Sequence, residues 1–377
     1  MLADHFSAHH RSILSAIVEY QARAQAFALC MVVDTEGSTY RKAGALAVVA
    51  GDGTRRGVIS GGCLESSLEQ TALESLHDGL ARYVVYDTHS DDDVVFGSGS
   101  GCRGRMHLLF VPVLPETPND LCEALRSADS NHRVLKLALV TVGHAIAHGY
   151  GWQGTETTAI GSAGAGAGVR ELLRFRESAS GRYSVPIATR AVSCAVWTVP
   201  PTQRLLLIGA GPESPILLDL ALLMGWRVTL CDHRQSALLS YGAGADHTQL
   251  GAPLAAVAAL SDQHFDACVI MTHSASNDLQ ALCTLALRPE GFIGLLGPPA
   301  RRDELLEQLA PAVRHALVGR LHAPVGLRVG GNGPEALALS IGAELQNYLS
   351  ARPTRAGAAA AVNSEGSALL PPLSTHS

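Results

Sequence analysis

Apolar positions in the first part of the chain follow two different periods. Ile13, Leu14 and Ile17 recur at the spacing of one helical face, so we expect an amphipathic helix over residues 11–24. A second helix is predicted over residues 64–76. Short apolar runs bounded by glycine-bearing turns are typical of strands. Such runs lie at 27–33, 45–50, 56–59, 82–86 and 106–111. This part of the chain therefore reads as a mixed α/β domain.

The pattern after Pro200 and Pro201 is more regular. Helical stretches separate short apolar runs at 205–208, 227–231, 267–272 and 292–296. Strands that alternate with helices indicate a Rossmann-like, doubly wound parallel sheet. We expect residues 120–200 to be a less regular extension of the first domain. Beyond Leu349 no periodic apolar face remains, which favours a disordered tail. The expected division is an N-terminal domain over 1–200, a Rossmann-like domain over 201–350 and a tail over 351–377.

Composition excludes several classes of protein. The 377 residues are 47% hydrophobic and 16% charged, which suits two ordinary cores. A formal charge of -6 provides no field that would draw the chain to nucleic acid or to an anionic membrane. The N-terminus lacks the apolar core of a signal peptide and His144 or Asp219 interrupts the longest apolar stretches, so we expect a cytoplasmic protein without membrane spans. The eight cysteines form no C-x-x-C pair, which indicates reduced thiols and no zinc site.

The strongest local feature is a glycine pair before a cysteine, at the junction of a predicted strand and a predicted helix. Gly61 and Gly62 let the backbone expose successive N–H groups where the helix dipole favours an anion. Cys63 then lies where the pKa of a thiol tends to fall, and Glu65 follows in the first helical turn. A reactive or ligand-contacting thiol and a small buried residue at a tight turn both fit this pattern.

Two further loops offer backbone donors and cations. Between residues 97 and 104 every other position is glycine until Gly101, Cys102 and Arg103, a composition that can wrap a ligand and favour a thiolate. The loop at 37–44 contains Ser38 and Arg41, and an arginine can bind a phosphate in bidentate fashion. A flexible surface segment and a plain hairpin are the alternatives for these two loops.

The second domain begins with part of a dinucleotide fingerprint. Gly209 and Gly211 follow a predicted strand and open a helix, and Asp232 ends the next strand, where a carboxylate can reach a ribose hydroxyl. Pro212 removes one N–H from the turn, and serine replaces the third glycine at position 214. His273 follows another strand, at the edge of the sheet where ligands collect. The candidate nucleotide-binding residues are Gly209, Gly211, Asp232 and His273.

Eight motifs, taken together and in order, resemble the xanthine dehydrogenase accessory factor family, also called the XdhC/CoxI family. The resemblance covers most of residues 10–350. The motifs are GSTYRKAGA at 37–45, GVISGGCLE at 57–65, GSGCRG at 99–104, LLLIGAGPES at 205–214, VTLCDHR at 228–234, MTHSASND at 271–278, GLLGPPARRDELL at 294–306 and PVGLRVGGNGPEALALSIGAEL at 324–345.

The resemblance implies a cofactor chaperone and not an enzyme. Such a protein binds the molybdenum-pterin cofactor, in its mono- or dinucleotide form, and protects it during sulfuration. It then inserts the cofactor into a molybdenum hydroxylase of the xanthine dehydrogenase type. The implied partners are the large subunit of that hydroxylase, a cysteine desulfurase and a second copy of the chain in a homodimer. The resemblance favours Cys63 and Cys102 as cofactor contacts, and Cys102 is the candidate contact to molybdenum.

Two other functions remain open at this point. Gly209, Gly211 and Asp232 on a doubly wound sheet also suit an NAD(P)-dependent oxidoreductase, although no second motif places a substrate acid or base beside a hydride donor. A binding module without a cofactor is the other alternative, with the Rossmann-like half as a docking surface. Arg103 and Pro212 both depart from the pattern that is usual in the family.

Overall fold

The computed structural model describes residues 10–62, 64–87, 104–115, 119–142, 145–153, 156–160, 180–187 and 190–351. The chain divides into two compact units, and the boundary follows Pro201. Of the described residues, those up to Pro201 form the first unit and those from Thr202 to Ala351 form the second. The expected tail after residue 351 lies outside the described residues.

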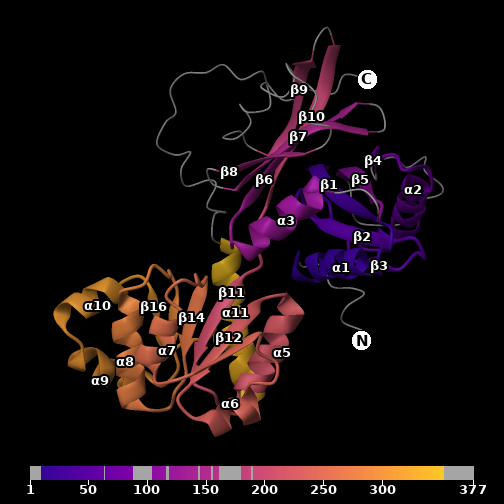
Figure 1. Ribbon diagram of the computed structural model, residues 1–377. Helices are drawn as coiled ribbons and strands as arrows, with labels where there is room; N and C mark the ends of the chain where they lie inside the picture. Colours follow the sequence, from indigo (N-terminus) through magenta and orange to yellow (C-terminus); the bar gives the residue numbers. More distant parts are fainter. Residues whose placement is uncertain are drawn as a thin grey trace, which may run out of the picture. The chain divides into compact units, whose positions relative to one another are not determined.

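The first unit contains an antiparallel sheet in the strand order β3-β2-β1-β5-β4 (Figure 1). Its strands are β1 (Phe27–Gly37), β2 (Leu46–Ala50), β3 (Arg55–Arg56), β4 (Arg82–Asp87) and β5 (Gly104–Val113). Its helices are α1 (His10–Ala22) and α2 (Glu65–Asp78). Pro112 is tolerated in β5 because β4 pairs with β5 only as far as Phe110, so the ladder with β4 needs no N–H from residue 112.

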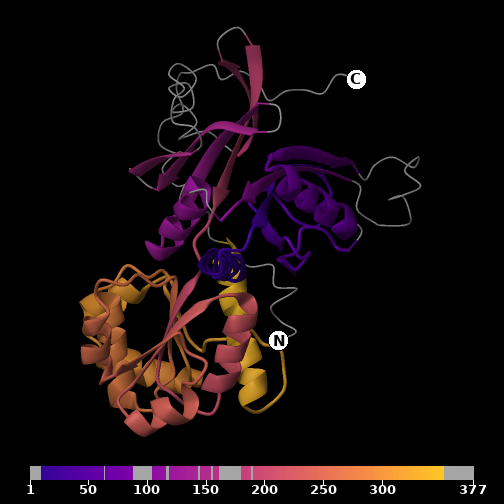
Figure 2. The ribbon, with the colours of Figure 1, turned by 45° about the vertical axis from the view of Figure 1, so that its right-hand side comes forward.

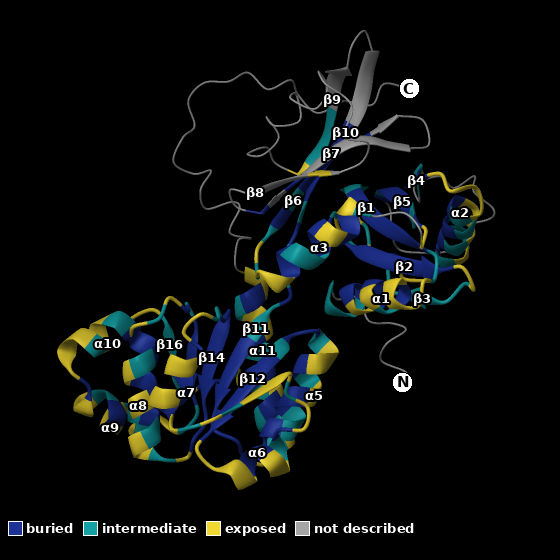
Figure 3. Cartoon of the chain, in the orientation of Figure 1, coloured by how far each residue is buried: buried dark blue, intermediate teal, exposed yellow. Residues whose placement is uncertain are grey.

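Both faces of this sheet are covered, which explains the continuous apolar run of β1. On one face Ala28, Cys30 and Val32 pack with α2. On the other face Phe27, Leu29 and the residues that alternate with them pack with α1 and with α3 (Asp120–Ser130). The buried strand segments therefore appear dark blue on β1 and β2 in Figure 3. A strand that is buried on both faces cannot show the alternation of a half-exposed strand.

Residues 120–200 are more regular than the sequence indicated. After α3 they form a second antiparallel sheet in the order β8-β7-β6-β10-β9. Its strands are β6 (Leu135–Val142), β7 (Ala145–Gln153), β8 (Glu156–Ile160), β9 (Gly181–Ile187) and β10 (Arg190–Val199). The expectation of an irregular extension was wrong because β7 contains two interior glycines and β8 is mostly polar, both of which weaken the signal of a strand.

The second unit is a six-stranded parallel sheet in the order β13-β12-β11-β14-β15-β16, with helices against both faces (Figure 2). This confirms the predicted doubly wound fold. The strands are β11 (Arg204–Ile208), β12 (Arg227–Asp232), β13 (His247–Leu250), β14 (Ala267–Ile270), β15 (Ile293–Leu295) and β16 (Leu321–His322). The helices are α5 (Ser214–Met224), α6 (Gln235–Tyr241), α7 (Pro253–Ala259), α8 (Ala275–Ala286), α9 (Pro299–Gln308), α10 (Pro311–Leu317) and α11 (Pro334–Ala351).

The two outer strands of this sheet were not predicted. β13 is an edge strand whose four residues are polar or exposed, and β16 has only two residues. Neither carries an apolar run, because an edge strand buries little surface. Within the described ranges, no helix combines the length and the apolar character needed to cross a membrane.

Replacing Trp197 with alanine tests the core between the sheet of β1 and the second sheet. The Trp197 side chain on β10 is fully buried in the cluster that contains α1, β1, α3 and β6. Its loss should lower the free energy of unfolding of the first unit by about 3–5 kcal/mol. Val18→Ala on the exposed face of α1 is the control and should change it by less than about 0.5 kcal/mol. Urea denaturation measures both; an equal effect of the two substitutions would contradict this description of the core.

Candidate functional site

The loop that follows β1 contacts the start of β5 where these two neighbouring strands end. β1 ends at Gly37, which pairs with Gly104 at the start of β5. A Cβ atom at position 104 would lie 2.6 Å from the carbonyl oxygen of Ser38 and 2.7 Å from that of Glu36. No side chain can fit at this contact. The loop after β1 can therefore approach the start of β5 this closely only because residue 104 is a glycine.

Tyr40 connects the same loop to the glycine pair before α2. A Cβ atom at Gly61 would lie 3.4 Å from the Tyr40 ring, so the ring packs on the Gly61 backbone. The tyrosine is nevertheless 60% exposed. Gly62 has a φ of +112° with open space where its Cβ would be, and Gly61 and Gly62 are both exposed. An exposed aromatic ring and exposed backbone thus lie side by side, and the sequence analysis had not singled out Tyr40.

The Glu65 carboxylate fixes the turn that leads into α2. Its Oε1 accepts hydrogen bonds from the backbone N–H of Ser60 at 3.1 Å and from the Ser60 hydroxyl at 2.9 Å. Its Oε2 lies 2.6 Å from the guanidinium of Arg55. The Ser60 hydroxyl oxygen accepts in turn from the N–H of Leu64 at 3.2 Å. Glu65 therefore holds the ends of the turn 60–64 together, and its contacts are those of a residue that positions the turn.

The remaining predicted residues of the first unit have different surroundings. Ser38 is exposed beside Gly104. Arg41 is partly buried and close enough to His10 for its charge to lower the pKa of that imidazole, although burial is the larger cause. The other four candidates of the first unit lie outside the described residues: Cys63, Gly101, Cys102 and Arg103.

A polar network that the sequence did not reveal lies on the same sheet, near the glycine contact. Arg182 on β9 donates to Asp34 at 2.9 Å and to Glu36 at 2.9 Å. His107 Nε2 lies 3.1 Å from the Glu36 carboxylate, and its Nδ1 lies 2.8 Å from the Tyr83 hydroxyl. Because a carboxylate only accepts, Nε2–H donates to Glu36, and neutral His107 accepts at Nδ1 from Tyr83. The chain joins residues 148 positions apart here, a spacing that no local pattern encodes.

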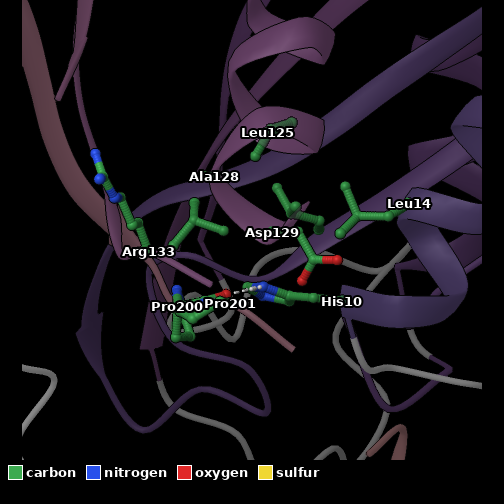
Figure 4. A pocket seen from close by; sticks show the side chains of 10 residues that line it. His10, Leu14, Leu125, Ala128, Asp129, Arg133, Pro200 and Pro201 are labelled. Carbon is green, nitrogen blue, oxygen red and sulfur yellow. Dashed lines mark hydrogen bonds between the residues drawn. The ribbon is translucent and has the colours of Figure 1, made fainter. Parts of the chain in front are cut away.

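A hollow beside the start of α1 is too small to be the site. Figure 4 shows it between His10, Asp129 and Pro200, with the His10 Nδ1 atom 3.0 Å from the Pro200 carbonyl oxygen. Its volume of about 10 Å³ corresponds to roughly one water molecule. A heteroaromatic ligand does not fit there.

In the second unit, the predicted fingerprint is used for internal contacts. Gly209 has a φ of +108°, and any Cβ there would collide with the carbonyl group of Met271. The Asp232 carboxylate accepts from the N–H of Ala210 at 2.8 Å and from the Arg234 guanidinium at 2.8 Å and 2.9 Å. Burial alone would raise the pKa of Asp232, but these hydrogen bonds outweigh it and hold the pKa below its usual value.

The polar motifs at the carboxyl edge of the second unit also bind one another. Asp278 at the start of α8 is buried and accepts from the Arg301 guanidinium at 2.6 Å and from the Thr272 hydroxyl at 2.5 Å. His273 has a φ of +57°, and its Nε2 lies 3.2 Å from the Glu213 carboxylate. Asp278 belongs to the MTHSASND motif and Arg301 to the GLLGPPARR motif, so an ion pair connects the two motifs. The polar residues of both motifs therefore have partners within the protein.

The described cysteines differ sharply in exposure. Cys30, Cys122, Cys194, Cys231 and Cys268 are buried. Burial raises the pKa of Cys122 and of Cys231 to about 12. Cys283 on α8 is exposed, which the sequence analysis did not anticipate. Any experiment on thiol reactivity must therefore account for Cys283.

The network around His107 predicts a specific response to pH. Burial, followed by the positive charge of Arg182, holds the pKa of His107 below its usual value. The unfolded chain then binds a proton at a higher pH than the folded chain does, so stability is lost as pH falls below the unfolded value of about 6.5. In thermal unfolding between pH 7.5 and 5.5, His107→Gln should lose less stability than the unsubstituted protein. His315→Gln, at an exposed position on α10, is the control and should follow the unsubstituted protein. A steeper loss in His107→Gln would contradict a neutral His107.

Two family models match the chain. The family model described as the XdhC Rossmann domain matches residues 205–345, and the model described as the XdhC and CoxI family matches residues 20–87. The chain is 29% identical over 336 residues to a protein of Bacillus subtilis (strain 168) that is named as a probable subunit of xanthine dehydrogenase. The match covers 89% of this chain and 96% of that protein.

Two further similarities agree with these matches. Over 101 residues, 26% of this chain and 32% of the other protein, the chain is 35% identical to the molybdenum cofactor insertion chaperone PaoD of Escherichia coli (strain K12). The crystal structure of a xanthine dehydrogenase from Bacillus halodurans is similar with a TM-score of 0.71 at 26% identity, and the match covers 91% of this chain and 96% of that one. The resemblance found in the motifs is thereby confirmed, and the chain belongs to the XdhC/CoxI family.

Proposed function

We propose that the chain is an accessory factor that binds the molybdenum-pterin cofactor at the glycine-rich edge of its first unit. In this proposal it protects the cofactor during sulfuration and inserts it into a molybdenum hydroxylase of the xanthine dehydrogenase type. The observation that carries the proposal is the meeting of three glycine-rich segments. Gly104 packs on the loop 37–44, and Tyr40 of that loop packs on Gly61.

The described residues at this edge fit the chemistry of the cofactor. A pterin is a flat heteroaromatic system, and the exposed Tyr40 ring offers it a stacking surface. A phosphate needs N–H donors, and the exposed backbone at Gly61 and Gly62 precedes the N-terminus of α2. The N–H of Gly62 makes only a long hydrogen bond of 3.4 Å to the Ser60 hydroxyl, which a phosphate oxygen could replace. The open space at Gly62 would be filled by any larger residue. When bound, the cofactor would supply the molybdenum centre of the recipient enzyme, and the chain itself would only hold and shield it.

The names of two relatives support this role. One is named as a probable subunit of xanthine dehydrogenase, which supports the type of recipient, and another as a molybdenum cofactor insertion chaperone, which supports the direction of transfer. We therefore propose the large subunit of a molybdenum hydroxylase as the recipient, a cysteine desulfurase as the source of sulfur and a homodimer as the working form. Cys63 and Cys102 are proposed as cofactor contacts, together with Gly101 and Arg103, and Cys102 as the contact to molybdenum.

Replacement of the two proposed thiols tests the cofactor site directly. Cys63→Ser and Cys102→Ser should each lower bound molybdenum per purified chain by about tenfold or more, because loss of a metal contact or of its support has effects of this size. Both substitutions are made in a Cys283→Ser background, which removes the exposed thiol of α8. Molybdenum is measured by mass spectrometry, and thermal unfolding is recorded for each variant.

The control for this experiment is Cys283→Ser alone, which should keep its full molybdenum content. Activation of the recipient hydroxylase should fall in parallel with the molybdenum content of the two thiol variants. If both variants remain folded, retain molybdenum at the level of the control and activate the hydroxylase, the thiols are structural and this assignment is wrong.

A second prediction concerns the aromatic surface. Tyr40→Ala should weaken retention of the pterin by an amount typical of stacking on an aromatic side chain, about 1–3 kcal/mol. Tyr40→Phe preserves the ring and should retain the pterin as the unsubstituted protein does. The readout is the fluorescence of the oxidised pterin released per chain. Equal retention by Tyr40→Ala and Tyr40→Phe would exclude stacking on this ring.

A further inference from the structure

The glycine turn of the second unit has already used nearly all of its hydrogen-bond donors. The N–H of Gly209 donates to the Cys231 carbonyl at 2.8 Å, and the N–H of Ala210 donates to Asp232 at 2.8 Å. The N–H of Gly211 donates to the Ser214 hydroxyl at 3.0 Å. Pro212 has no N–H. A dinucleotide fold normally directs such groups at a pyrophosphate, but in this turn they are engaged within the protein.

The N–H of Ser214, at the start of α5, is engaged as well, because it donates to the Gly211 carbonyl at 3.0 Å. Within the described residues, Glu213 is therefore the one member of the turn whose N–H has no hydrogen bond of its own. Between Gly209 and Ser214, a pyrophosphate would find a single donor, and that donor belongs to the residue that carries a carboxylate. The next N–H without a hydrogen bond among the described residues is that of Ile216, in the first turn of α5.

The Glu213 carboxylate itself lies against the turn. Its two oxygens lie 2.7 Å and 3.0 Å from the position that a Cβ would take at Gly211, so the carboxylate packs on the Gly211 backbone. The residue is 4% exposed. Oε1 lies 3.2 Å from His273 Nε2, and among the described residues Oε2 has no hydrogen-bond partner. A nearly buried carboxylate with an unused acceptor thus occupies the N-terminal end of α5.

The charge of Glu213 determines which ligands can bind at the N-terminal end of α5. The N-terminus of a helix carries a partial positive charge that stabilises one nearby anion, and the carboxylate of Glu213 already supplies that anion. A phosphate brought to the same place would lie beside a buried like charge with few free donors to compensate, which is strongly unfavourable. A neutral group that donates N–H or O–H bonds would instead find an available acceptor at Oε2.

We infer that Glu213 determines the ligand specificity of the second unit by taking the place of a dinucleotide pyrophosphate. The turn rejects NAD(P) and other ligands that would present a pyrophosphate to it, whereas an uncharged or cationic hydrogen-bond donor could use the free acceptor at Oε2. This inference is independent of the proposed function, because the proposed cofactor site lies in the first unit. It removes the physical basis for an NAD(P)-dependent oxidoreductase.

The test is calorimetric titration of the full chain with NADH and, separately, with inorganic pyrophosphate. The unsubstituted protein should bind neither at millimolar concentration. Glu213→Gln keeps the shape of the side chain and removes its charge, and it should bind NADH at least about tenfold more tightly. Asp219→Asn is the matched control, because Asp219 is an exposed acid on the same helix, and it should behave as the unsubstituted protein does.

Each other outcome overturns the inference. Micromolar binding of NADH by the unsubstituted protein would mean that Glu213 does not exclude the pyrophosphate. Glu213→Ser serves as a second variant, and thermal unfolding establishes that both variants are folded. If the folded variants bind NADH no better than the unsubstituted protein, the carboxylate is not what keeps the nucleotide out. Pterin and molybdenum content are not measured, so failure here leaves the proposed function standing.

Discussion

The first unit depends on one strand that is buried on both faces. β1 lies between β2 and β5, and its alternate side chains pack on α2 and on α1 with α3. A strand so enclosed cannot slip by one residue without moving apolar side chains into the wrong core. Its register therefore fixes where Gly37 meets Gly104, and with it the position of the loop that carries Tyr40. The polar end of the same strand supplies Asp34 and Glu36 to the network around Arg182. The packing of the buried part of β1 thus determines where the residues of the candidate site lie.

The parts of the molecule that could be predicted are those encoded by patterns within short stretches of the sequence. The alternation of strands and helices after Pro201 gave the parallel sheet correctly, and the motifs gave the family. The second sheet was missed because Gly149 and Gly151 interrupt β7 and because one of its pairings joins β6 to the distant strand β10. The site was predictable only in part. Gly61 and Gly62 were found because glycine at a strand-to-helix junction has a local meaning, whereas the packing of Tyr40 on Gly61 depends on the fold.

In the second unit, the residues of a dinucleotide fingerprint make contacts within the protein. Gly209 is required by the close approach of Met271, which is a constraint of packing. Asp232 retains its place at the end of β12, yet its oxygens are bound by Ala210 and Arg234. The glycines and the acid of a dinucleotide fingerprint can therefore be kept by the geometry of the strand-turn-helix unit alone. The nearly buried Glu213 places a carboxylate at this turn.

Arg182 has a consequence for how the first unit can be divided. It is carried by β9, in the second sheet, and it forms ion pairs with two carboxylates on β1, in the first sheet. A gene fragment that stopped before the second sheet would leave Asp34 and Glu36 without this cation and would also uncover the apolar side chains of β1 that face Trp197. The two sheets consequently share one core and one set of ion pairs, and we expect the shortest folded fragment of this half of the chain to extend through β10.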